Sequence, residues 1–172
     1  AQGFSIISRG RLLFILQVGQ EITLLCEGSD HPFWLSYLDL ERDYQAVIRS
    51  INPKDAYLAA AARAGSGIRI LAQDPWEMII TFLISQQKTI PAIQSLVEAL
   101  SRTYGKPIAF PGQTFYSFPT PEELSQASLE DLQAMKLGYR AKYIYRICRD
   151  ALSGSLDLEP LKQMAYGEAM EY

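Results

Sequence analysis

The chain opens with short runs of apolar and β-branched residues, and this pattern predicts three strands, over residues 4–8, 11–17 and 22–26. Arg9-Gly10 separates the first two runs as a turn. Three consecutive strands with short connections favour an antiparallel meander. Because residue 1 stands almost at a strand, we expect this sheet to be partial.

From residue 41 onward the apolar spacing becomes helical, and several helix starts carry a capping residue followed by proline. Asn52-Pro53 predicts a helix that ends at Ala64. The run from Asp74 to Glu77 has a cap, a proline at the first helical position and a glutamate at the third, which is a capping-box arrangement. Further helices are expected after Thr89, Thr120 and Ser128, and over residues 140–152 and 157–166.

Residues 105–119 contain three prolines with aromatic residues between them, and this segment is predicted to be a long ordered connection rather than a helix. The predicted class is therefore α+β. We expect a partial N-terminal antiparallel β domain over residues 1–33, followed by a mainly helical domain over residues 34–172.

Composition supports a folded chain, because 48% of residues are hydrophobic and 20% are charged. Cys26 and Cys148 are far apart and are interpreted as reduced core residues, although a disulfide remains an alternative. His31 is interpreted as a surface histidine in a loop before a proline. No apolar run reaches about 18 residues, so we expect neither a membrane span nor a membrane partner.

The net charge of −3 by itself argues against a nucleic-acid partner, but the charges are unevenly distributed. Residues 136–149 hold five cations and no acid: Lys136, Arg140, Lys142, Arg146 and Arg149. A basic stripe of this kind can bind phosphates on a chain that is acidic overall. From charge alone, a solvated helix face explains the stripe equally well.

Two polar clusters are candidates for binding. Ser85-Gln86-Gln87-Lys88-Thr89 offers amides, hydroxyls and a cation in a turn between two predicted helices. The alternative is an ordinary interhelical loop.

The second cluster runs from Lys136 to Lys142 and contains Gly138, Tyr139 and Arg140. A tyrosine can wedge into a base stack while neighbouring cations hold phosphates. The alternative is a helix start whose tyrosine packs on the core.

A catalytic centre is not expected in this sequence. Zinc, thiol, nucleophile-elbow and phosphate-loop motifs are absent from it. Glu122 and Glu123 stand in a predicted first helical turn, where negative charge suits the helix dipole. We therefore expect no catalytic residue, no metal ligand and no cofactor.

Several segments resemble 8-oxoguanine DNA glycosylases, in that family's order and over most of residues 11–172. They are Trp34–Leu40, Asp74–Ile93 with its D-P-x-E helix and polar turn, Phe118-Pro119, and the L-G-Y-R-A-K-Y run Leu137–Tyr143. The resemblance implies an enzyme that flips a damaged purine out of duplex DNA and cuts its glycosidic bond. It further implies that the catalytic lysine and aspartate of a helix-hairpin-helix element would follow residue 172, so this chain alone is expected to be inactive.

The resemblance also assigns roles to individual residues. Tyr139 falls on the wedge tyrosine, Arg140 on the arginine that contacts the estranged base, and Gln87 on the residue that fills the vacated space. Ala92 stands where an arginine helps to select cytosine, which puts opposite-base selectivity in doubt. Ser85, Gln86, Lys88 and Lys142 complete the predicted DNA-binding set.

The implied partner is double-stranded DNA with a damaged purine, bound by an intracellular monomer, cytoplasmic in a bacterium or nuclear in a eukaryote. Whether the enzyme also has a lyase step stays open. Two alternatives remain: an alkylpurine glycosylase of the same superfamily, whose G-Q-Q turn is similar to Ser85–Gln87, and a non-enzymatic helical interaction module.

Overall fold

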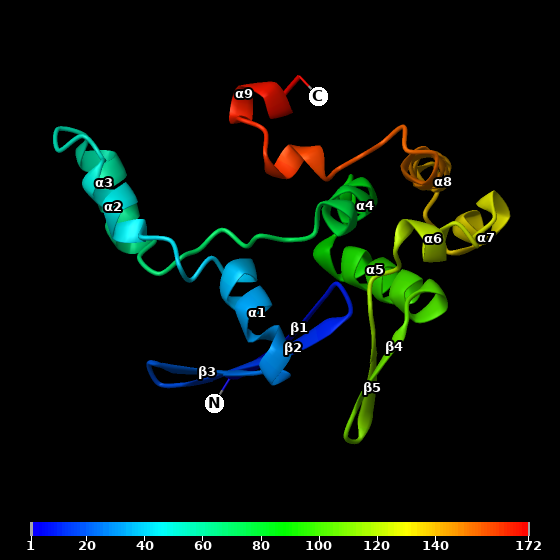
Figure 1. Cartoon of the computed structure of the whole chain (residues 1–172), viewed down its shortest axis with the longest axis horizontal. Coiled ribbons are helices and arrows are strands. Elements are labelled where there is room, and N and C mark those ends of the chain that lie inside the picture. The colour runs from blue at the N-terminus through cyan, green and yellow to red at the C-terminus, as the bar shows by residue number, and fades with distance from the viewer. Residues whose placement is uncertain (1, 172) are drawn as a thin grey trace. The chain divides into compact units, whose positions relative to one another are not determined.

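The computed structural model describes residues 2–171 and combines a small N-terminal antiparallel sheet with a mainly helical remainder (Figure 1). The predicted α+β class is confirmed. The chain forms two compact units, one of residues 1–24 with 74–172 and the other of residues 25–73. The domain boundary expected between residues 33 and 34 falls inside the second unit and stays a prediction.

The three predicted strands are present and pair in the order β1-β2-β3. Their bounds are Gln2–Ser8 for β1, Arg11–Val18 for β2 and Glu21–Leu25 for β3. Strands β1 and β2 are antiparallel, with Ser8 opposite Arg11. The two turn residues both have positive φ, 49° at Arg9 and 75° at Gly10, which is the twist that a two-residue hairpin requires.

The first unit continues from residue 74 with a helical core and one hairpin. Its elements are α4 (Pro75–Ser85), α5 (Ile90–Tyr104), β4 (Pro107–Phe110), β5 (Gln113–Tyr116), α6 (Pro121–Leu124), α7 (Leu129–Ala134), α8 (Arg140–Leu152), the 3-10 turn η2 (Pro160–Lys162) and α9 (Tyr166–Ala169). Helix α4 packs against α5 and α8, and α8 also packs against α6 and α7. Fully buried Ile80, Leu100 and Ile144 fill the space between them. Two of the predicted helix starts, at Thr120 and Ser128, form capping boxes, whereas Thr89 begins α5 without a side-chain cap hydrogen bond.

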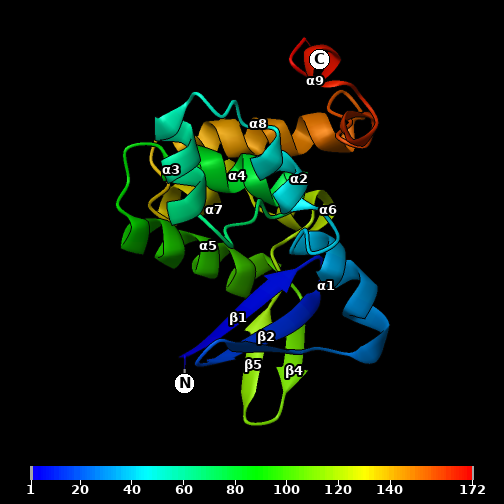
Figure 2. The ribbon, with the colours of Figure 1, turned by 90° about the vertical axis from the view of Figure 1, so that its left-hand side faces the viewer.

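The segment predicted as a long ordered connection contains the β4–β5 hairpin. Pro111-Gly112 forms its two-residue turn, with Gly112 at φ 81°. The ring of Phe110 lies 4.6 Å from that of Phe14 in β2, centroid to centroid, and Phe115 lies 5.7 Å from the same ring. The hairpin thus lies beside the first two strands (Figure 2).

The second unit holds the 3-10 turn η1 (Gly28–Asp30) and the helices α1 (His31–Tyr37), α2 (Tyr44–Arg49) and α3 (Ala56–Ala64). His31 therefore begins a helix rather than lying in a loop. The helix start predicted at Asn52 is wrong. The carboxylate of Asp55 accepts the 2.8 Å hydrogen bond from the amide of Leu58, whereas Asn52 caps a turn by accepting from the amide of Lys54.

The helix predicted over residues 157–166 is also wrong. The carboxylate of Asp157 accepts from the amide of Glu159 at 3.0 Å, so its side chain competes with helix formation. Only η2 follows, and α9 begins at Tyr166.

Candidate nucleic-acid interface

The polar turn after α4 is held in a specific backbone conformation. Gln86 leaves the helix with an extended ψ of 122°, and Gln87 takes a left-handed φ of 52°. The amide of Lys88 closes the turn on the carbonyl of Ser85 at 3.1 Å. Both glutamine side chains are exposed, whereas the Ser85 hydroxyl bonds back to the carbonyl of Phe82. Two amides are therefore presented outward by a kinked backbone.

The second cluster precedes α8 and also depends on unusual backbone angles. Lys136 and Gly138 have φ values of 61° and 63°. Between them, Leu137 is fully buried in the helical core. The buried leucine anchors the segment, and Tyr139 emerges with 51% of its surface exposed. Tyr139 thus does not pack into the core, which was the alternative weighed for it.

Arg140 joins the two clusters across the 54 residues that separate it from Gln86. One Nη donates a hydrogen bond to the carbonyl of Gln86, and the other donates to that of Leu137 at 3.3 Å. The guanidinium carbon lies 4.5 Å from the centroid of the Tyr139 ring. The exposed ring and the polar turn are therefore held by a single side chain.

The charge of Arg140 is notable because the residue is only 6% exposed. Its Nε has no hydrogen-bond partner among the described residues, and no ion pair to it occurs between them. Carbonyls and an aromatic ring are the groups that face it. The buried cation is therefore stabilised by two carbonyls and the Tyr139 ring rather than by a carboxylate.

The remaining predicted residues differ in how closely they join this arrangement. Lys88 is half-buried in the turn, and Lys142 is exposed on α8. The structure brings together Gln86, Tyr139 and Arg140, with Gln87 next in the chain. The roles that the resemblance assigned to all seven residues stay predictions.

Two exposed residues of α8 were left out of the predicted DNA-binding set, although Arg146 belongs to the basic run of residues 136–149. Tyr143 is 56% exposed and its ring meets that of Tyr139 at 6.2 Å and 86°. Arg146 has an 83% exposed side chain. The signal was available, because positions 139, 142, 143 and 146 follow the i, i+3, i+4, i+7 spacing of one helix face.

The start of α4 departs from the expected capping box. Asp74 accepts from the amide of Glu77 at 3.1 Å and from Arg9 at 2.6 Å. Within residues 2–171 the Glu77 carboxylate makes no return hydrogen bond to the cap. Burial, and secondarily the charge of Asp74, raise the pKa of Glu77 to about 7.

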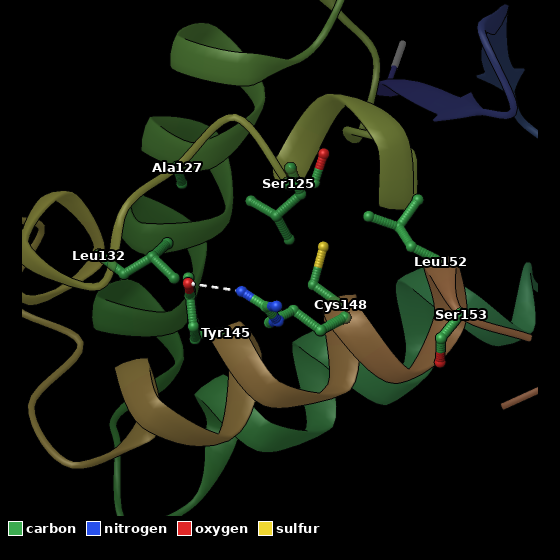
Figure 3. Close-up of a pocket in the computed structure, with 9 residues that line it drawn as sticks. Ser125, Ala127, Leu132, Tyr145, Cys148, Leu152 and Ser153 are labelled. Atoms are coloured by element: carbon green, nitrogen blue, oxygen red, sulfur yellow. Dashed lines mark hydrogen bonds between the residues drawn. The ribbon is translucent and has the colours of Figure 1, made fainter. Parts of the chain in front are cut away.

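A cavity of about 350 Å³ lies on another side of α8 (Figure 3). Tyr145, Cys148 and Leu152 line it from α8, and the Tyr145 hydroxyl accepts from Arg149 at 3.1 Å. Burial, and then the charge of Glu122, raise the pKa of Cys148 to about 11, so its thiol stays protonated at neutral pH. The thiol in this cavity is therefore not an activated nucleophile.

Two further observations on residues 2–171 concern metal ligands and membrane spans. Acidic, histidine and cysteine side chains in that range form no group of three that could hold a metal ion. None of the helices described there has the length and apolar character needed to cross a membrane.

Comparison with known proteins decides the family. Residues 7–79 match the N-terminal domain of 8-oxoguanine DNA glycosylase, and residues 80–169 match the HhH-GPD superfamily of base excision DNA repair proteins. The chain belongs to the 8-oxoguanine DNA glycosylase family. This glycosylase family member carries both matches in the order that its sequence motifs predicted, so the resemblance is confirmed.

Individual relatives agree with the family. An N-glycosylase/DNA lyase of Saccharomyces cerevisiae is 36% identical over 110 residues, which are 63% of this chain and 29% of the relative. A probable N-glycosylase/DNA lyase of Methanothermobacter thermautotrophicus is 30% identical over 153 residues, 77% of this chain and 48% of the relative. The chain thus spans less than half of each relative.

A solved structure extends the agreement to the fold. It is the Clostridium acetobutylicum 8-oxoguanine glycosylase/lyase in complex with double-stranded DNA containing cytosine opposite 8-oxoguanine. The TM-score is 0.87 at 29% identity, covering 98% of this glycosylase family member and 59% of the solved chain.

Proposed function

We propose that this chain forms the DNA-contacting part of a base-excision repair enzyme. The enzyme flips 8-oxoguanine out of duplex DNA and cuts its glycosidic bond, with or without a lyase step. The observation that carries the proposal is the Arg140 bridge to Gln86, because it holds an exposed tyrosine beside an amide-rich turn. A base-flipping enzyme needs both features at one opened base step.

Each residue has a physical task in this proposal. The Tyr139 ring enters the stack next to the estranged base, and the Arg140 guanidinium donates to that base. The Gln87 amide occupies the space that the flipped purine leaves. Lys142 is exposed and binds a backbone phosphate, while Ser85, Gln86 and Lys88 form the surrounding turn.

The relatives support the substrate. The Clostridium acetobutylicum structure holds DNA with cytosine opposite 8-oxoguanine, and both curated relatives are named for glycosylase and lyase activity. The proposed partner is therefore a damaged-purine duplex, bound by a monomer inside the cell. Ala92 supplies no cation for selecting the opposite base, so this part of the specificity is proposed to be weak.

The wedge is tested by binding the 172-residue chain to two duplexes, one intact and one with an abasic analogue opposite cytosine. Tyr139→Ala is expected to weaken binding about tenfold on the abasic duplex, because an aromatic ring contributes only where the stack is open. On intact DNA the loss should be much smaller. Tyr57→Ala, which removes an 86% exposed tyrosine from α3, is the matched control. Equal losses on both duplexes would overturn the wedge.

The substrate is tested with the product of the whole gene, rather than with the 172-residue chain, on duplexes that contain either 8-oxoguanine or an alkylated purine. Excision of 8-oxoguanine supports the proposal. Excision of the alkylated purine alone would establish the alternative glycosylase activity, and no DNA binding at all would favour an interaction module.

A further inference from the structure

The outward face of α8 continues past the wedge. Four residues, Tyr139, Lys142, Tyr143 and Arg146, follow one another along this face, and we call them the α8 stripe. Their i, i+3, i+4, i+7 spacing places them on one side of the helix over about 10 Å. All four are exposed.

The aromatic half of the α8 stripe is an edge-to-face pair. The Tyr143 ring lies edge-on to the Tyr139 ring at 6.2 Å. The Arg140 guanidinium carbon lies 4.5 Å from the centroid of the same Tyr139 ring. The wedge ring therefore has two close neighbours, and its contact with Tyr143 restricts its rotation.

The basic half of the α8 stripe is available for an anion. The Lys142 side chain is exposed on α8. Arg146 has one weak ion pair, with its Nε 3.7 Å from an Asp150 carboxylate oxygen, and 83% of its side chain is exposed. By contrast, Arg102 on α5 holds Glu98 at 2.7 Å.

We propose that Tyr143 and Arg146 extend the DNA interface by one helical turn beyond the wedge. Arg146 binds a backbone phosphate next to the one held by Lys142, and Tyr143 is a positioning residue for Tyr139. On a chain with a net charge of −3, phosphate attraction has to come from such a local group of cations. Interleaved aromatic rings and cations fit DNA better than an apolar protein partner. The inference rests on the proposed function.

The phosphate contact is tested by the salt dependence of binding. Arg146→Gln in the 172-residue chain should reduce the slope of log K against log salt by about 1, equally on intact and abasic duplexes. Arg146→Lys should restore the slope. Arg102→Gln removes a paired cation from α5 and should leave the slope unchanged.

Asp150→Asn should increase the affinity for DNA, which a folding defect would not do. It frees Arg146 from its weak ion pair and should tighten binding about two- to threefold. An unchanged slope for Arg146→Gln, or an unchanged affinity for Asp150→Asn, would overturn the phosphate contact.

The positioning role has its own readout. Tyr143→Leu should reduce the preference for abasic over intact DNA while leaving the salt slope unchanged, and Tyr143→Phe should retain the preference because the ring contact remains. Equal behaviour of the two variants would contradict this role. If the full chain has no abasic preference, the wedge proposal itself fails. If it has the preference but Arg146→Gln has no effect on the slope, the extension alone fails.

Discussion

The Arg140 guanidinium donates to the backbone carbonyl of Gln86, so the start of α8 and the end of α4 share one hydrogen-bonded cation. Arg140 is buried and gives a second hydrogen bond to Leu137. Arg140→Gln should therefore lower the free energy of unfolding by about 2 kcal/mol, since hydrogen bonds from charged donors contribute more than neutral ones. Urea unfolding followed by circular dichroism measures the loss.

Arg102→Gln is the matched control for this prediction. It removes an exposed i,i+4 ion pair with Glu98, whose contribution should be about 0.5 kcal/mol or less. Similar losses for both arginines would mean that the bridge to Gln86 contributes little to stability.

Glu77 makes stability depend on pH. Its pKa rises from 4.5 to about 7 on folding, chiefly by burial. The folded state therefore binds more protons than the unfolded state between these values. The contribution of Glu77 to the free energy of unfolding is complete below about pH 4.5 and is lost as the pH rises through about 7. The full loss corresponds to about 3 kcal/mol.

Glu77→Gln should remove this pH dependence. The variant is expected to be more stable than the unmodified chain at pH 8, and similar to it near pH 4.5. Unfolding in urea at both pH values measures the difference, with exposed Glu21→Gln in β3 as control. A variant that is no more stable than the unmodified chain at pH 8 would show that burial does not raise the pKa of Glu77.

Gly105 has a steric reason to lack a side chain. A Cβ at this position would lie 1.9 Å from the carbonyl oxygen of Ser117 and 2.7 Å from that of Ser101. Both are backbone atoms, so the contact cannot be relieved by a rotamer change. Gly105→Ala should cost about 3 kcal/mol in thermal or urea unfolding. Gly167→Ala in α9, where a Cβ meets nothing within 4 Å, should cost nothing.

The 172-residue chain should leave an 8-oxoguanine·cytosine duplex uncut, and borohydride should trap no adduct. A lysine nucleophile needs a desolvated site to be activated. Lys136 and Lys142 are exposed, and Lys88 lies half-buried in the polar turn. The Clostridium acetobutylicum glycosylase/lyase is the positive control. A cleaved strand or a covalent adduct above the buffer background would place the chemistry within these residues.

Local signals in the sequence predicted much of the fold. Asp74, Thr120 and Ser128 cap helices as expected, because each side chain reaches an amide three residues on. Local signals failed where they competed. Asn52 and Asp55 are both good caps, and only the second has a continuous helix after it.

The β4–β5 hairpin was missed for a different reason. Its strands have four residues each and their packing partner, Phe14, lies about a hundred residues earlier in the chain. Such nonlocal packing leaves little trace in a short segment. In the candidate interface, the sequence indicated which types of residue would bind DNA. It could not predict the hydrogen bond from buried Arg140 to the Gln86 carbonyl, because the two residues are 54 positions apart.

Each compact unit contains one of the chain's two tryptophans. Trp34 is 1% exposed in the unit of residues 25–73. Trp76 is 8% exposed in the other unit, where its indole nitrogen donates to the Pro119 carbonyl at 2.9 Å. Each unit therefore has its own tryptophan as an intrinsic fluorophore. With Trp34→Phe the remaining emission follows the unit that holds the interface, and with Trp76→Phe it follows the other, so the melting of each can be recorded without an added label.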